Sequence, residues 1–168
     1  MSHEAHHQHD ARTLRCAVIT VSDTRTPDTD GSGQRIKELL RAAGHHIVQY
    51  QILKDESDLI AAAVQAMPAA VEVIILNGGT GLAQRDTTFE AVRRLYQKEI
   101  PGFGELFRML SYAEIGAAAM LSRATAGVVG TRVVFSLPGS TAAVELGMAK
   151  LIVPALGHVL GLVRGHQG

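Results

Sequence analysis

The sequence predicts an α/β fold, a three-layer α/β/α sandwich with a mostly parallel central sheet. Two observations support this prediction. Short apolar runs rich in β-branched residues alternate along the chain with segments whose apolar residues recur at helical spacing. Apolar residues make up 46% of the chain but aromatic residues only 4%. The core must therefore rest on Ala, Val, Leu and Ile, which suits helices packed on a parallel sheet.

The first half of the chain alternates two strands with two helices. Residues 14–21 and 46–53 are apolar runs typical of strands, and a long polar loop over 22–33 follows the first of them. Residues 34–43 have apolar side chains on one helical face and precede a glycine, which commonly ends a helix. Residues 58–67 begin with a capping aspartate and precede a proline, so they form the second predicted helix.

The second half begins with the most apolar strand of the chain. Residues 71–76 are rich in Val and Ile and predict a buried strand, and residues 88–98 predict the helix after it. The Pro-Gly-Phe-Gly run at 101–104 is expected to break the chain. The other predicted elements are short helices at 105–110 and 113–121, a strand at 132–137, an alanine-rich helix at 142–153, and one or two further turns over 154–162.

Length and charge limit the classes of protein to consider. We expect one domain over residues 13–168, preceded by a disordered, histidine-rich leader over residues 1–12. The 16 basic residues balance the 16 acidic ones, so no overall field favours nucleic acid or a membrane. We identify no apolar run of membrane-spanning length and no secretory segment, and expect a cytoplasmic protein. The single cysteine, Cys16, excludes an intrachain disulfide and indicates a buried thiol.

The most informative segment is a glycine-rich loop between the strand at 71–76 and the helix at 88–98. It contains Gly78, Gly79, Thr80 and Gly81, followed by Asp86. Glycines permit positive φ and close approach of a ligand to the backbone. Successive free N–H groups at a helix start form an anion site. The loop therefore predicts a phosphate site, with Asp86 placed to hold the accompanying metal ion.

An ordinary strand-to-helix turn is the alternative for this loop. It is not a P-loop, because no Gly-Lys-Ser/Thr follows, and its glycine spacing is wrong for a dinucleotide fingerprint. Arg85, in the same loop, is expected to contact phosphate or to form an exposed salt bridge; the sequence leaves both open.

Two further polar loops, over 22–33 and 137–141, follow predicted strands, and the carboxyl ends of parallel strands line the ligand crevice of such sheets. In the loop over 22–33, an alternative role for Ser32 is simple capping of the next helix. The loop over 137–141 has the same alternative, with Ser140 or Thr141 as the cap. The residues assigned to binding in these loops are Ser22, Asp23, Ser32, Gly33, Pro138, Gly139 and Ser140.

Five motifs occur in an order that is specific in combination, although each is weak alone. They are Val21-Ser22-Asp23 with Asp30-Gly31-Ser32-Gly33, Gly78-Gly79-Thr80-Gly81, Arg85-Asp86-Thr87-Thr88, Pro101-Gly102-Phe103-Gly104-Glu105 and Ser136-Leu137-Pro138-Gly139-Ser140. On these residues the chain resembles the molybdenum cofactor biosynthesis proteins of the molybdopterin adenylyltransferase type, the MoaB and MogA group, to which the gephyrin G domain is related. Residues 107–116 are most similar to the B subgroup.

The resemblance implies an enzyme that adenylylates molybdopterin. The terminal phosphate of molybdopterin attacks the α-phosphorus of ATP, and pyrophosphate is released, which prepares the product for molybdenum insertion. The family uses two acids for this chemistry, and they match Asp55, after the second strand, and Asp86. The chain keeps the Arg-Asp-x-Thr pattern that some B-subgroup members lose, which favours activity. The three polar loops are then expected to hold molybdopterin and ATP.

The two acids suit a metal-binding role better than a proton-transfer role. A phosphate nucleophile is already ionised near pH 7, so the carboxylates of Asp55 and Asp86 are best interpreted as Mg²⁺ ligands. We expect them to lie on neighbouring strand-end loops and to share one ion. Each has a structural alternative, since Asp55 is also a plausible turn residue and Asp86 a helix-stabilising acid.

The resemblance also implies partners. The family forms trimers and its B subgroup hexamers, so a homotrimer or homohexamer is expected, together with other molybdenum cofactor biosynthesis proteins as partners. Two rival functions remain open. One is a molybdopterin-binding or assembly protein of the same pathway that does not catalyse adenylylation, and the other is an unrelated phosphate-binding domain.

Overall fold

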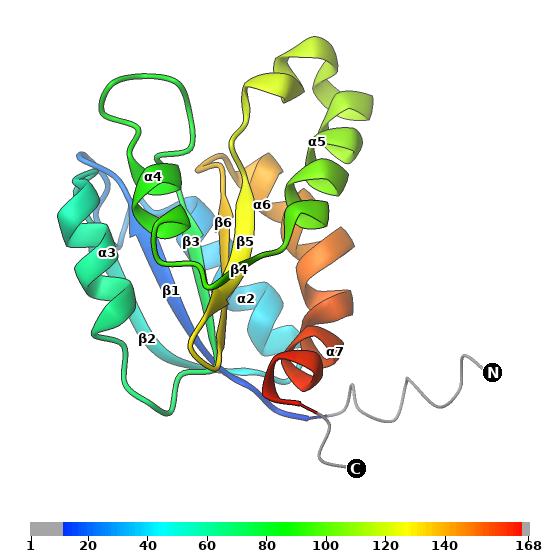
Figure 1. The fold of residues 1–168 in the computed structure, drawn as a ribbon. Coiled ribbons are helices and arrows are strands. Elements are labelled where there is room, and N and C mark those ends of the chain that lie inside the picture. Colours follow the sequence, from blue (N-terminus) through cyan, green and yellow to red (C-terminus); the bar gives the residue numbers. More distant parts are fainter. Residues whose placement is uncertain (1–11, 166–168) are drawn as a thin grey trace.

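The computed structural model describes residues 12–165, which fold around a six-stranded sheet in the order β2-β1-β3-β6-β5-β4 (Figure 1). Strands β2, β1, β3 and β6 are parallel, and β5 pairs antiparallel with both β6 and β4. The predicted mostly parallel sheet is confirmed. The predicted leader, apart from Arg12, lies outside the described residues. The strands are β1 (Arg15–Val21), β2 (His46–Leu53), β3 (Val73–Asn77), β4 (Lys98–Glu99), β5 (Thr125–Val129) and β6 (Arg132–Leu137).

Helices cover both faces of the sheet, as the predicted three-layer sandwich requires (Figure 1). Helices α3 and α4 lie on one face, and α2, α5, α6 and α7 lie on the other. The helices are α2 (Gly31–Ala42), α3 (Ser57–Gln65), α4 (Thr88–Arg93), α5 (Pro101–Ile115), the 3-10 helix η1 (Gly116–Leu121), α6 (Thr141–Gly147), the π-helical turn η2 (Met148–Ile152) and α7 (Val153–Arg164).

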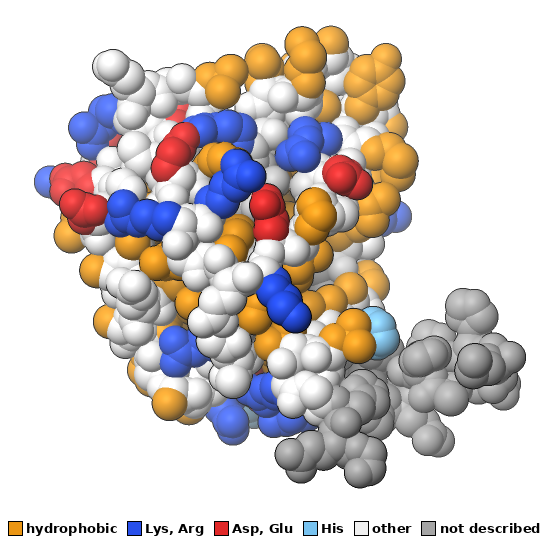
Figure 2. Space-filling view, in the orientation of Figure 1, with side chains coloured by type: hydrophobic (Ala, Val, Ile, Leu, Met, Phe, Trp, Pro, Cys, Tyr) orange, Lys and Arg blue, Asp and Glu red, His pale blue; other side chains and the backbone are white. Residues whose placement is uncertain are grey.

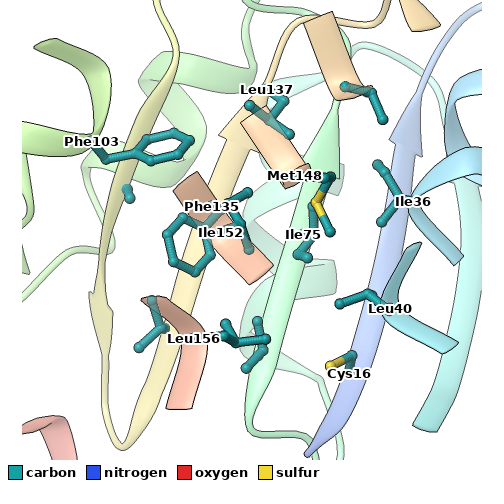
Figure 3. Close-up of a cluster of buried hydrophobic side chains, with 14 of the residues drawn as sticks. Cys16, Ile36, Leu40, Ile75, Phe103, Phe135, Leu137, Met148, Ile152 and Leu156 are labelled. Carbon is teal, nitrogen blue, oxygen red and sulfur yellow. The ribbon is translucent and has the colours of Figure 1, made fainter. Parts of the chain in front are cut away.

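Alternating residues of each strand supply the two cores. In β1, Cys16 and Val18 face the helices α2, α6 and α7, whereas Ala17 and Ile19 face α3 and α4. Figure 3 shows Cys16 among the aliphatic side chains of the larger core. Burial, with a smaller contribution from the charge of Glu72, raises the pKa of the Cys16 thiol to about 12. The expectation of a buried thiol is therefore confirmed.

The edge of the sheet differs from its prediction. Strand β5 is not among the predicted strands; three of its five residues are β-branched, but Ala126 and Gly127 interrupt the strand-forming run. Gly127 is needed there, since a Cβ would collide with the ring of Tyr96. The predicted helix over 88–98 is too long. Beyond α4 the N–H of Gln97 donates to the carbonyl of Val128, and β4 then pairs with β5.

The Pro-Gly-Phe-Gly run does not break the chain, so that prediction is wrong. Pro101 begins α5, a position where a helix needs no N–H donor. Gly104 allows α5 to pack closely on β5, because a Cβ there would approach the carbonyl oxygen of Ala124 to 2.6 Å. The two predicted short helices are thus one helix followed by η1.

Elements α6, η2 and α7 form one continuous helix from Thr141 to Arg164. Pro154 does not end this helix, because the wider π-helical turn precedes the proline. By length and composition alone the helix is apolar enough to cross a membrane, which corrects the expectation that no segment reaches that length. Its residues Val144, Ile152 and Leu156 are completely buried against the sheet, as in a helix that covers a sheet face.

Candidate functional site

A cavity of about 530 Å³ lies at the carboxyl ends of the parallel strands. Its lining comes from the end of β1 and the loop after it, from the loops after β3 and β6, and from the end of η1. The lining residues are Val21, Ser22, Thr24, Arg25, 78–81, Asp86, 121–122 and 138–139, whereas Asp23 lines the neighbouring cavity described below. Strand β2 pairs on one side of β1 and β3 on the other, so the strand order reverses at β1. A parallel sheet opens its ligand crevice at such a reversal. The cavity therefore brings together the three polar loops that the sequence singles out.

The glycines of the 78–81 loop are required by their surroundings. Gly78 and Gly79 have φ angles of +99° and +68°, a region that side chains with a Cβ rarely adopt. A Cβ on Gly78 would collide with the carbonyl oxygen of Val21, and one on Gly79 with the hydroxyl of Thr88. The loop is thus shaped by close contact with its neighbours as well as by backbone conformation.

Four successive backbone N–H groups of this loop, those of residues 79–82, have no hydrogen-bond partner within residues 12–165. The preceding amide, of Gly78, donates to the carbonyl of Leu137, and the N–H of Ala83 donates to Oδ2 of Asp86. Consecutive unpaired amides beside a cavity are the donor set that binds phosphate oxygens.

Asp55 extends from the loop after β2 to the loop after β3. Its Oδ1 accepts hydrogen bonds from the backbone N–H and the hydroxyl of Thr87, at 3.0 and 2.8 Å. These contacts bear out the expectation that Asp55 and Asp86 lie on neighbouring strand-end loops, since Thr87 directly follows Asp86. The loops meet although β1 lies between β2 and β3 in the sheet.

The two acids suit a metal ion that arrives with a phosphate ligand. Within residues 12–165, no group of three His, Cys, Asp or Glu side chains could hold a metal ion by itself. Mg²⁺, however, is usually held by one or two carboxylates together with substrate phosphates and water. Oδ2 of Asp55 and Oδ1 of Asp86 accept no hydrogen bond from any described residue, so each has an oxygen available for a cation.

Arg85 forms the exposed salt bridge that the sequence left as one of two outcomes. Its Nε lies 2.7 Å from Oδ2 of Asp23, and this hydrogen bond holds the pKa of Asp23 below its usual value. Oδ1 of Asp23 also accepts from the backbone N–H of Asp55, at 3.1 Å. Asp23 therefore joins the loops after β1, β2 and β3 at the rim.

A buried polar network supports the cavity from behind. Asp30 is completely buried, and its carboxylate accepts hydrogen bonds from the hydroxyls of Thr20 and Tyr50, at 2.6 and 2.5 Å, and from the N–H of Gly33. Burial alone would raise the pKa of Asp30, but these hydrogen bonds and the charge of Arg25 hold it below its usual value. Asp30 thus caps α2, a role for which the sequence had offered Ser32.

Ser32 and Gly33 belong to this network rather than to the cavity wall. Ser32 is buried, and its hydroxyl donates to Oδ1 of Asn77 at 2.7 Å. A Cβ on Gly33 would collide with the carboxylate of Asp30. Their assignment as direct ligand contacts is therefore corrected to a supporting role.

Arg25 is a site residue that the sequence analysis missed. Its guanidinium donates to the hydroxyl of Ser32 at 2.6 Å and to the carbonyl of Gly139 at 2.8 Å. Arg25 and Ser22 also line a second cavity of about 460 Å³, which extends toward Tyr50 and Lys54. A positive charge thus lies where the two cavities meet. The only sequence signal was an arginine within a long polar loop.

The third loop divides its residues between two roles. Pro138 and Gly139 line the first cavity. Ser140 is exposed, and its hydroxyl oxygen accepts from the N–H of Ala143 at 3.1 Å, which makes it the N-cap of α6. The capping alternative is therefore what the structure shows for Ser140.

Arg123 is the second residue that the sequence analysis missed. It precedes β5 and donates hydrogen bonds to the backbone carbonyls of Thr80, Gly81 and Asp86. Nothing in the sequence near Arg123 distinguishes it from a surface arginine, because its partners are 37–43 residues away.

Known proteins are similar to this chain in sequence and in fold. Residues 17–158 match the family described as a probable molybdopterin binding domain. Molybdenum cofactor biosynthesis protein B of Halalkalibacterium halodurans is 55% identical over 163 residues, covering 95% of this chain and 96% of the relative. The protein of the same name from Bacillus subtilis is 54% identical over 167 residues, covering 98% of both chains.

Solved structures agree with the sequence relatives. A crystal structure of molybdenum cofactor biosynthesis protein B superposes with a TM-score of 0.89 at 53% identity, covering 92% of this chain and 98% of that one. The tungsten cofactor synthesizing protein MoaB from Pyrococcus furiosus gives a TM-score of 0.81 at 40% identity, covering 92% and 99%. The chain therefore belongs to the molybdopterin-binding domain family, among the molybdenum cofactor biosynthesis proteins.

Proposed function

We propose that the protein is a molybdopterin adenylyltransferase, which transfers AMP from ATP to the terminal phosphate of molybdopterin and releases pyrophosphate. The observation that carries the proposal is the run of unpaired amides over residues 79–82, next to the half-buried carboxylates of Asp55 and Asp86. Amides of this kind bind phosphate oxygens, and carboxylates bind the cation that accompanies a triphosphate. Membership of the family supports molybdopterin as the second phosphate-bearing substrate.

The chemistry needs alignment of two anions more than proton transfer. A phosphate oxygen of molybdopterin attacks the α-phosphorus of ATP, the bond from that phosphorus to the bridging β-phosphate oxygen breaks, and the electron pair leaves on pyrophosphate. The loop amides and the Arg25 guanidinium orient the two anions and offset their repulsion. Mg²⁺, when held by Asp55 and Asp86, neutralises part of the phosphate charge.

Two adjoining cavities suit a reaction between two substrates. The 530 Å³ cavity contains the glycine loop, and the 460 Å³ cavity shares Ser22 and Arg25 with it. Each volume is in the range of small-molecule sites in proteins. The shared arginine is placed where phosphates of the two substrates would meet, and this arrangement supports a group-transfer enzyme over a protein that binds one ligand.

The direct test is incubation of the protein with molybdopterin, ATP and Mg²⁺ while pyrophosphate release is followed. We expect release that requires all three components and that yields adenylylated molybdopterin. Binding of molybdopterin without pyrophosphate release would favour the assembly-protein alternative. Binding of phosphate compounds without any affinity for molybdopterin would favour an unrelated phosphate-binding domain.

We further propose that the protein acts as a homotrimer or homohexamer in the cytoplasm, alongside other molybdenum cofactor biosynthesis proteins. Support for self-association comes from an exposed apolar face on α5 and η1, visible at the upper right of Figure 2. Contiguous exposed apolar surface of this kind marks protein interfaces. The side chains of this apolar face are 47–75% exposed and belong to Leu106, Met109, Tyr112, Ile115, Met120 and Leu121.

A further inference from the structure

Arg123 donates hydrogen bonds to backbone carbonyls of the glycine loop, on the side of the loop opposite Asp55. Its Nε donates to the carbonyl oxygen of Thr80 at 3.2 Å, and its Nη2 donates to the carbonyl oxygens of Gly81, at 2.6 Å, and Asp86, at 3.0 Å. Its Nη1 pairs with the carboxylate of Glu90. Most N–H groups of this guanidinium therefore already donate to other groups of the protein.

These contacts determine which way the loop amides point. In a trans peptide unit the C=O and the N–H point in opposite directions, and the described chain contains no cis peptide. The carbonyl of Thr80 points toward Arg123, so the N–H of the next residue, Gly81, points away from it. The carbonyl of Gly81 orients the N–H of Leu82 in the same way.

The third contact identifies what lies on the far side of the loop. The carbonyl of Asp86 shares a peptide unit with the N–H of Thr87, and this N–H donates to Oδ1 of Asp55. The peptide unit thus has Arg123 on one side and Asp55 on the other. The amides of Gly81 and Leu82, turned away from Arg123 in the same manner, are two of the four unpaired amides described above.

We propose that Arg123 is a positioning residue of the phosphate site. By holding the carbonyl oxygens of Thr80 and Gly81 it turns the amides of Gly81 and Leu82 toward the anion, and by holding that of Asp86 it ties the start of the loop to its end. Arg123 itself does not touch the phosphate. The inference rests on the proposed function for the identity of the anion, a phosphate group of ATP or molybdopterin.

A second arginine provides a matched control. Arg132, at the start of β6, donates to the carbonyl oxygens of Val71, Met67 and Pro68 at 2.9, 2.7 and 2.6 Å. The chemistry is the same as that of Arg123, but Arg132 lies at the opposite end of the parallel strands from the cavity. Replacement of either arginine therefore disturbs one loop, and only one of these loops belongs to the phosphate site.

The experiment compares Arg123→Lys with Arg132→Lys. Lysine keeps the charge but cannot span three carbonyl oxygens with a planar group. We expect Arg123→Lys to weaken the affinity for inorganic pyrophosphate with Mg²⁺, measured by calorimetry, at least tenfold, or about 1.4 kcal/mol. Arg132→Lys should stay within about twofold of the wild type, while both substitutions lower the melting temperature.

A second measurement uses the unmodified protein. Pyrophosphate should slow hydrogen exchange of the amides of residues 79–82 in the wild type. If Arg123→Lys does not fold, this measurement alone tests whether these amides face the anion. Unchanged affinity in folded Arg123→Lys, or no such protection, would overturn the inference. A wild type that binds no pyrophosphate would overturn both this inference and the proposed function. A wild type that binds pyrophosphate but adenylylates nothing would overturn the proposed function alone.

Discussion

Asp55 accepts two hydrogen bonds from Thr87, one from its backbone N–H at 3.0 Å and one from its hydroxyl at 2.8 Å. The contact crosses over β1, which separates the strands that carry the two loops. It holds one carboxylate oxygen of Asp55 and leaves the other without a partner in the described chain. Because Thr87 directly follows Asp86, the two proposed metal ligands are linked through a single residue.

Asp86→Asn should abolish adenylylation while leaving the fold and molybdopterin affinity largely intact. The amide oxygen of Asn can still accept the hydrogen bond that Asp86 takes from Ala83, but the negative charge for Mg²⁺ is lost. We expect turnover to fall at least about a hundredfold, the scale of removing one electrostatic contact from an active site.

The control for this variant is Asp58→Asn. The Asp58 side chain is 98% exposed and pairs with Arg94 on the surface, so the same chemical change there should leave turnover unaltered. Pyrophosphate release by Asp86→Asn at the wild-type rate would remove Asp86 from the metal site.

Gly79→Ala should weaken the affinity for ATP or molybdopterin at least about tenfold, or 1.4 kcal/mol. Its φ of +68° and the collision of a Cβ with Thr88 would displace the loop and its amides. Gly130→Ala is the matched control, because Gly130 has a φ of +63° but open space around its Cβ position. Both variants should lose about 1–2 kcal/mol of stability from the backbone alone. Titration calorimetry that gives equal affinities for the two variants would mean that the loop glycines only form a turn.

Glu72→Gln should destabilise the protein at neutral pH. Glu72 is almost completely buried at the opposite end of the sheet, where it pairs with Arg12 and Arg164 and accepts from the N–H of Arg15. Burial would raise its pKa, but these partners hold the pKa below its ordinary value of 4.5. A lowered pKa means that the charged carboxylate stabilises the fold above pH 4.5 and that this stabilisation is lost as the pH falls through the folded-state pKa.

Urea unfolding at several pH values measures this effect. We expect a deficit of about 1.5 kcal/mol for Glu72→Gln at pH 7, the scale of a hydrogen bond to a charged group. The deficit should shrink as the pH falls below 4.5, because the wild-type side chain then becomes neutral too. A deficit that stays constant with pH would mean that shape rather than charge matters at this position.

Met109→Glu should dissociate the oligomer. Met109 is 60% exposed in the apolar face of α5 and η1, and a charge there would be buried without a partner in a subunit interface. Leu162→Glu is the control, since Leu162 is 63% exposed on α7, outside that face. Sedimentation should give a trimer or hexamer of the 17.9 kDa chain for the wild type and for Leu162→Glu, and smaller species for Met109→Glu. A wild-type monomer at micromolar concentration would contradict the proposed assembly.

The sequence alone determined the four parallel strands and the position of their ligand edge. The predicted strands over 46–53 and 132–137 coincide with β2 and β6. Strands β1, β3 and β6 are recognisable because both of their faces are buried, which demands continuous apolar, β-branched residues, whereas β2 lies at the edge of the sheet and is only partly buried. The three polar loops meet at one cavity because the carboxyl ends of parallel strands lie at the same edge. Two glycines of the central loop do adopt the predicted positive φ.

Only the tertiary structure decided which side chains complete that edge. Arg25 reaches a carbonyl 114 residues away, and Arg123 reaches carbonyls 37–43 residues away. Ser32 was predicted to contact the ligand, but its hydroxyl donates to Asn77. For Arg85 the sequence left open a phosphate contact or a salt bridge, and the structure shows the salt bridge to Asp23. Residue types and spacing reflect local backbone preference and burial. A hydrogen bond between distant segments depends on where the packed helices and strands bring each donor, and local sequence contains no record of that distance.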